Sequence, residues 1–152
     1  MIKAPEASSY EELLDKFGTI ATNTVGKSMF PLFKTHRDAV VIKKKDGPLK
    51  KYDVVCYKIG SRYVLHRIID IRGGICIIRG DNTYKKEYVL ENKILGVLVS
   101  FNRRGKHHEV TELGYKIYSR VWHCLYFPRY LFVLAFRGAR KIFRIFFPKK
   151  RK

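Results

Sequence analysis

Acidic residues are scarce in this sequence. Of its 152 residues, 13 are Asp or Glu and 32 are Lys or Arg, so the formal net charge is +19. No acid at all follows Glu112. Such a charge predicts attraction to polyanions: nucleic acid, an acidic leader peptide or the anionic face of a membrane. It does not indicate a fold.

Cysteine is scarce too. The three cysteines, Cys56, Cys76 and Cys124, are widely spaced and form no CxxC pair. An odd number without close spacing excludes both a disulfide framework and a cysteine zinc site. We therefore expect free thiols, no bound metal and no cofactor.

Long hydrophobic runs are also missing. No run approaches the roughly 20 apolar residues that a helix needs to span a bilayer. The opening "MIKAPEASSYEELLDKF" carries Glu6, Glu11, Glu12 and Asp15 where a signal peptide needs an apolar stretch. The sequence therefore predicts neither a secretion signal nor a transmembrane span, and we expect a location on the cytoplasmic side.

The residues that are present divide the chain into three segments. Hydrophobic residues make up 46%, which is enough for a folded core. Residues 1–19 predict a lead-in and a short helix over 8–18. Ser8 or Ser9 can cap this helix, acids fill its first turn and Gly18 ends it.

Residues 20–110 predict a mostly β domain. Short β-branched runs such as "DAVVIKK", "DVVCYKI" and "ILGVLVSF" alternate with turn residues, which is typical of a coiled antiparallel sheet or a barrel. The runs "YVLHRIIDI" and "GICIIRG" on either side of Gly73 and Gly74 predict a hairpin with a tight glycine turn.

Residues 111–152 predict a basic, aromatic helical tail. A helix here would gather its Arg and Lys side chains opposite a wide apolar face. Such a helix can lie in the headgroup plane of an anionic membrane, or it can dock on the protein's own β domain. We favour the membrane surface, with contacts from Trp122, Phe132, Phe136, Arg137, Arg140, Lys141 and Arg144.

Ser28, in "GKSMFP", is a candidate nucleophile. A serine needs a base to take its proton and usually a third group to orient that base. His66 lies between apolar residues in a predicted strand, where a barrel strand would aim it at a fixed point. Histidines in such positions are more often structural. Asp81 and Glu87 are candidates for the third group.

Four motifs in this order resemble the sequence boxes of the S24/S26 serine peptidases, specifically type I signal peptidases. They are "GKSMFP", "VLHRII", "RGDN" and "ILGVL", and the resemblance runs from about residue 25 to 101. It implies a coiled, mostly antiparallel β domain with Ser28 as nucleophile. A histidine where typical bacterial members carry lysine resembles the histidine branch of the family, with His66 as base and an acid at Glu87 or Asp81 as third member.

The resemblance also implies a substrate and its contacts. It predicts a serine endopeptidase that cleaves leader or signal peptides through an acyl-enzyme intermediate. Met29 and Pro31 would shape the loop and the substrate groove, and the backbone N–H of Ser28 would hold the oxyanion. Gly26 stands where many members carry a serine that helps to bind the oxyanion.

Two hypotheses of other classes remain. The charge, and the Arg and Lys residues interleaved with aromatics, would suit a nucleic-acid binder. However, no helix-turn-helix or RNP-like signature is present, so nucleic acid is not the expected partner. The chain could also be an inactive interaction protein with the peptidase fold.

Overall fold

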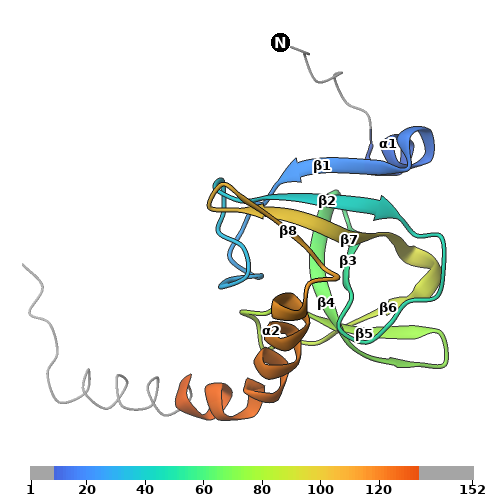
Figure 1. The fold of residues 1–152 in the computed structure, drawn as a ribbon. Helices are drawn as coiled ribbons and strands as arrows, with labels where there is room; N and C mark the ends of the chain where they lie inside the picture. Colours follow the sequence, from blue (N-terminus) through green and yellow to red (C-terminus); the bar gives the residue numbers. More distant parts are fainter. Residues whose placement is uncertain (1–8, 134–152) are drawn as a thin grey trace, which may run out of the picture.

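An antiparallel sheet of eight strands forms the body of the protein in this computed structural model, which describes residues 9–133 (Figure 1). The strands run in the order β1-β2-β7-β3-β4-β5-β6, and β8 pairs with β7. They are β1 (Thr19–Asn23), β2 (Ala39–Lys44), β3 (Val54–Ile59), β4 (Arg62–Arg72), β5 (Ile75–Arg79), β6 (Glu87–Leu90), β7 (Ile94–Arg103) and β8 (Lys106–Glu109).

Three helices accompany the sheet in the described residues: α1 (Tyr10–Phe17), the 3-10 helix η1 (Glu91–Lys93) and α2 (Leu113–Cys124). The predicted mostly β, antiparallel class is confirmed. The sequence allowed either a coiled sheet or a barrel. The sheet is not closed, because β1 and β6 lie at its two ends and do not pair with each other. It is therefore not a closed barrel.

Strand β3 is buried on both of its faces. Val54 and Cys56 belong to one core cluster, whereas Val55 and Tyr57 belong to a second. Because successive side chains of a strand point to opposite faces, a strand between two clusters needs an unbroken apolar run. That requirement explains the run "VVCY" at this position.

Helix α1 begins and ends where the sequence predicts. Ser9 caps it in a reciprocal capping box with Glu12, and Gly18 ends it in the left-handed conformation (φ 70°). Leu14 anchors the helix in the first core cluster. Phe17, at the end of the helix, is 61% exposed.

The predicted hairpin is β4 and β5. Gly73 and Gly74 form its turn with φ of 53° and 76°, as a type I′ turn requires. This turn sets the register of β4, the longest strand, which carries His66.

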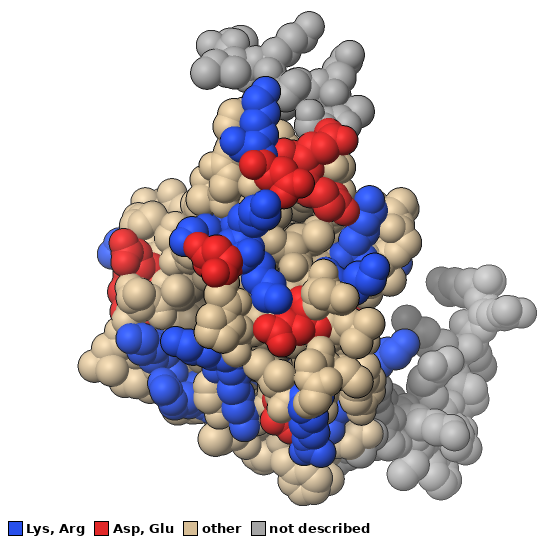
Figure 2. Space-filling view, turned by 90° about the vertical axis from the view of Figure 1, so that its right-hand side faces the viewer, with Lys and Arg blue, Asp and Glu red and all other residues tan. Residues whose placement is uncertain are grey.

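The first part of the predicted tail is helical. Helix α2 is followed by a further helical stretch over residues 126–133, while residues 134–152 lie outside the described part of the chain. Within residues 9–133, no helix is long and apolar enough to cross a membrane. Figure 2 shows the face on the right-hand side of Figure 1, where most charged side chains in the lower half are Lys or Arg.

Candidate functional site

Ser28 lies in the loop between β1 and β2, which descends from the sheet toward α2 (Figure 1). Asp38 closes this loop. Its buried carboxylate accepts hydrogen bonds from the backbone N–H groups of Lys34 (2.8 Å) and Arg104 (3.3 Å) and from the guanidinium of Arg37 (2.7 Å). The bond from Arg37, with these N–H groups, lowers the pKa of Asp38 to about 2 despite burial.

The segment around Ser28 is also fixed from the β5–β6 loop. The backbone N–H of Asn82 donates to the Ser28 carbonyl (2.7 Å), and the Asn82 amide donates to the Lys27 carbonyl (3.1 Å). Gly26 has a φ of 91°, so a serine at this position would be strained. Its carbonyl accepts the Thr35 hydroxyl.

His66 is held by a carboxylate. The ring is 6% exposed on β4, and its Nδ1 lies 3.0 Å from Glu87 Oε2. The Tyr57 hydroxyl donates to the same Glu87 oxygen and lies 3.2 Å from His66 Nδ1. A carboxylate on Nδ1 favours the tautomer with the proton on that nitrogen, which leaves Nε2 as a hydrogen-bond acceptor.

Gly80 lies next to both the Nε2 side of the His66 ring and the Ser28 carbonyl. A Cβ atom on Gly80 would lie 2.6 Å from the Ser28 carbonyl oxygen and 3.0 Å from His66 Nε2. Glycine at this position therefore allows the two segments to approach. No hydrogen bond joins Ser28 Oγ to His66 Nε2 within the described residues, and such bonds are often long in enzymes without substrate.

Ser28 and His66 open into one pocket of about 580 Å³. Its apolar lining includes Met29, Phe33, Val40, Ile42 and Leu65, and residues 22–25 at the end of β1 form one rim. Because β1 is an edge strand, a peptide in extended conformation could pair with its free side.

Cys56, a thiol, lines the same pocket. Burial raises the pKa of its thiol to about 12. The thiolate is the reactive form of cysteine, so Cys56 is inert at neutral pH. Ser28 therefore stays the candidate nucleophile of a pocket that also contains His66.

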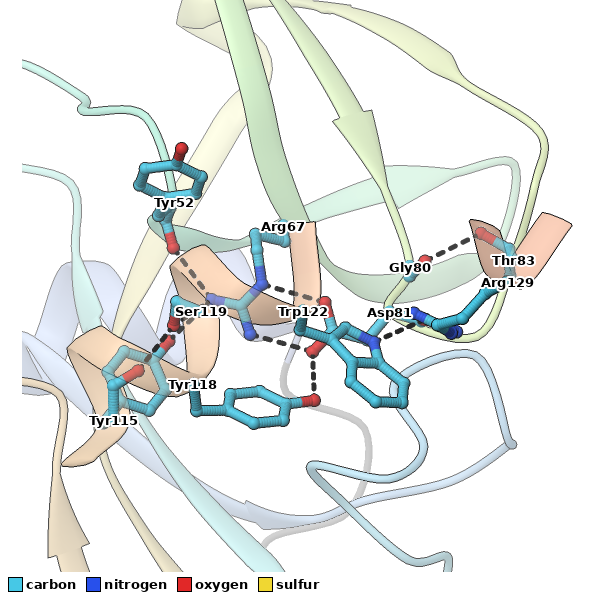
Figure 3. Close-up of polar contacts among 10 residues, drawn as sticks. All are labelled: Tyr52, Arg67, Gly80, Asp81, Thr83, Tyr115, Tyr118, Ser119, Trp122 and Arg129. Atoms are coloured by element: carbon cyan, nitrogen blue, oxygen red, sulfur yellow. Dashed lines mark hydrogen bonds and ion pairs between the residues drawn. The ribbon is translucent and has the colours of Figure 1, made fainter. Parts of the chain in front are cut away.

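Asp81 does not contact His66. Its carboxylate forms a buried, two-pronged ion pair with Arg67, with both N–O distances at 2.8 Å (Figure 3). The Tyr118 hydroxyl donates to it as well (3.0 Å), and Arg67 also donates to Ser119 Oγ (2.8 Å). Of the two acids that the sequence offered for His66, the structure places Glu87 on the ring and Asp81 in a link to α2.

Trp122, predicted as a membrane contact, is half-buried and bonds to the protein through its indole N–H. Its indole Nε1 donates to the Asp81 carbonyl (2.9 Å), and Arg129 stacks on its ring while donating to the same carbonyl (Figure 3). Phe132 is exposed. The other predicted contacts, Phe136, Arg137, Arg140, Lys141 and Arg144, lie outside the described residues.

The three residues predicted to contact the substrate or the oxyanion do not all lie at the pocket. Gly26 and Met29 line the pocket, whereas Pro31 is not part of its lining and offers its carbonyl to Arg103 (3.1 Å). In residues 9–133 no three His, Cys, Asp or Glu side chains come together to hold a metal ion.

Tyr57 was not among the predicted site residues. Tyr57 lies on the same face of β3 as Val55, which pairs directly with His66, so it is diagonal to His66 across the two strands. A polar aromatic residue in the apolar run "VVCY" was the available signal, because a buried tyrosine hydroxyl needs a partner.

No family model matches the chain, and no curated protein sequence matches it.

Proposed function

We propose that this protein is a serine endopeptidase that cleaves leader or signal peptides. The observation that carries the proposal is the position of His66, with Glu87 on Nδ1 at 3.0 Å and the Ser28 segment beside Nε2 across Gly80. This is the order of groups that a nucleophile, a base and an orienting acid require. The resemblance to the histidine branch of the S24/S26 peptidases supports the same roles.

In this mechanism His66 Nε2 takes the proton of Ser28 Oγ as that oxygen attacks the peptide carbonyl. Glu87 stabilises the imidazolium that forms. The Ser28 N–H, which donates to no other described residue, is available for the oxyanion. His66 then gives its proton to the leaving amine, and an acyl-enzyme on Ser28 remains. Water, deprotonated by His66, releases the acid and restores the serine.

The pocket supports a peptide substrate. It joins an apolar floor to the free edge of β1, which an extended chain can use for backbone pairing. We infer that side chains on one face of the substrate enter the pocket while its backbone lies along residues 22–25. We also propose that the enzyme works at a membrane surface on the cytoplasmic side, in keeping with the net charge of +19.

The test is cleavage of a fluorogenic leader peptide with small residues at the −3 and −1 positions by the full-length protein. Ser28→Ala and His66→Ala should each lower the rate by about 10³-fold or more, and Glu87→Gln by about 10²- to 10⁴-fold in kcat with little change in KM. Loss of the orienting carboxylate permits the wrong tautomer, which explains the effect on kcat.

The matched controls are Ser61→Ala, in the exposed β3–β4 turn, and His107→Ala, on exposed β8, both of which should cleave like the wild type. Glu91→Gln, on η1, is the control for Glu87→Gln. Unchanged cleavage in both Ser28→Ala and His66→Ala would show that this pair does not carry the reaction.

A further inference from the structure

The outer face of α2 carries an apolar stripe that is exposed among the described residues. Leu113, Ile117, Val121 and Leu125 follow one another at intervals of four residues and are 72%, 51%, 49% and 44% exposed. We call these four residues the α2 stripe. Spacing of four places them on one side of the helix, so they form a continuous apolar surface.

The inner face of α2 makes its contacts through different side chains. Tyr115 and Ser119 contact Arg67, while Tyr118 and Trp122 contact Asp81. These bonds fix the rotation of the helix about its axis. The α2 stripe is therefore held outward by the fold.

Positive charge lines one flank of the α2 stripe. Lys116 and Arg120 lie on the exposed flank of the helix, and with Lys50 and Lys51 they line a hollow of about 210 Å³. A second hollow, of about 510 Å³, lies beside His123 and is lined by Lys51, Arg72 and Lys86 among others.

Acids are fewer than cations on the same surface. Asp53 and Asp70 line the two hollows, and Asp70 pairs with Arg72 (2.7 Å). Glu112, the N-cap of α2, is exposed next to Leu113 and lies 3.1 Å from His108 Nδ1. The sequence after Glu112 contains Lys and Arg but no Asp or Glu. The surface beside the α2 stripe is thus suited to anions.

We propose that the α2 stripe is the docking surface of this protein for an anionic lipid bilayer. An apolar stripe flanked by cations fits the boundary between acyl chains and headgroups, where each nearby Lys or Arg contributes about 1 kcal/mol. An antiparallel contact with a second copy of the chain fits less well, because it would lay the flanks with Lys116 and Arg120 of the two copies side by side. The surface stands independently of the peptidase proposal.

The test is co-sedimentation of the full-length protein with vesicles of phosphatidylcholine and phosphatidylglycerol in a 7:3 ratio. Ile117→Gln combined with Val121→Gln should lower the partition coefficient by about 10-fold, because both side chains leave the apolar boundary. Neither residue belongs to a described core cluster, so the double variant should keep its fold, which circular dichroism checks. The matched control is Phe17→Gln with Ile59→Gln, two exposed apolar residues on α1 and β3 that line neither hollow.

Three results would overturn the proposal. They are equal pelleting of the α2 double variant and the wild type, equal binding of the wild type to pure phosphatidylcholine, and a vesicle-free dimer that the double variant abolishes in analytical ultracentrifugation. Peptide cleavage in detergent should be the same in the double variant and the wild type. Failure of docking is therefore separable from failure of the peptidase function.

Discussion

Asp81 is paired with Arg67, the chain neighbour of His66, and not with His66 itself. Because adjacent residues of a strand point to opposite faces, His66 turns to the pocket while Arg67 turns to α2. The β5–β6 loop has the same division: Gly80 and Asn82 contact the Ser28 segment, whereas Asp81 between them reaches Arg67. One strand and one loop thereby connect the candidate site to the C-terminal helix.

This connection predicts a large cost for breaking the pair. Asp81→Ala leaves the Arg67 guanidinium buried without its partner, so the free energy of unfolding should fall by about 3–5 kcal/mol in urea denaturation. The control is Asp70→Ala, which breaks the exposed pair with Arg72 and should change stability little.

A second variant separates the charge from the packing. Replacing the whole pair, as Arg67→Met with Asp81→Leu, should recover part of the loss, since no charge is then left unpaired. If Asp81→Ala cost no more than Asp70→Ala, the pair would not be the link between the sheet and α2.

Asp38 predicts an acid-dependent loss of stability. Its pKa is lowered to about 2 in the folded protein, chiefly by its hydrogen bond from Arg37, against about 3.9 for an unfolded aspartate. A lowered pKa stabilises the fold above pH 4, and this contribution disappears as the pH falls from about 4 to about 2.

Asp38→Asn should therefore be less stable than the wild type by about 2 kcal/mol at pH 6, and the two should converge near pH 2. Urea denaturation at pH 6, 4 and 2.5 measures the difference. A gap that stayed constant over this range would contradict the assigned role of the carboxylate.

Much of the fold could be predicted from local signals in the sequence. Ser9 and Gly18 bound α1 through cap chemistry, and Gly73 and Gly74 fix the β4–β5 hairpin, since each signal acts within a few residues. Strands β1, β6 and β8 were not predicted. Their sequences, "TIATN", "EYVL" and "KHHE", are short and carry polar residues. Strands β1 and β6 lie at the edges of the sheet, and β8 pairs with β7 alone. Their pairing comes from tertiary structure, which propensity does not contain.

The candidate site, too, could be predicted only where the signal is local in the sequence. Ser28, His66 and Glu87 were recognisable because motif order carries them. The choice between Glu87 and Asp81 was not, since it depends on which face of β4 each acid meets. The orientation of Trp122 could not be predicted either, because it depends on a hydrogen bond to the Asp81 carbonyl, 41 residues away in the sequence.

The substitution Gly80→Ala tests the geometry around Ser28 directly. In Gly80→Ala the new Cβ would stand 2.6 Å from the Ser28 carbonyl oxygen and 3.0 Å from His66 Nε2, so one of the two segments must move. We expect a stability loss of about 1–3 kcal/mol and a fall in peptide cleavage of about 10²-fold, since displacements near 1 Å at a reacting centre have effects of that size.

Gly47→Ala is the matched control, because a Cβ there meets nothing within 4 Å and its backbone needs no positive φ. It should fold and cleave like the wild type. In a folded Gly80→Ala protein, as judged by circular dichroism, unchanged cleavage would mean that the reacting groups do not meet at Gly80. The nucleophile would then have to be sought elsewhere in the pocket.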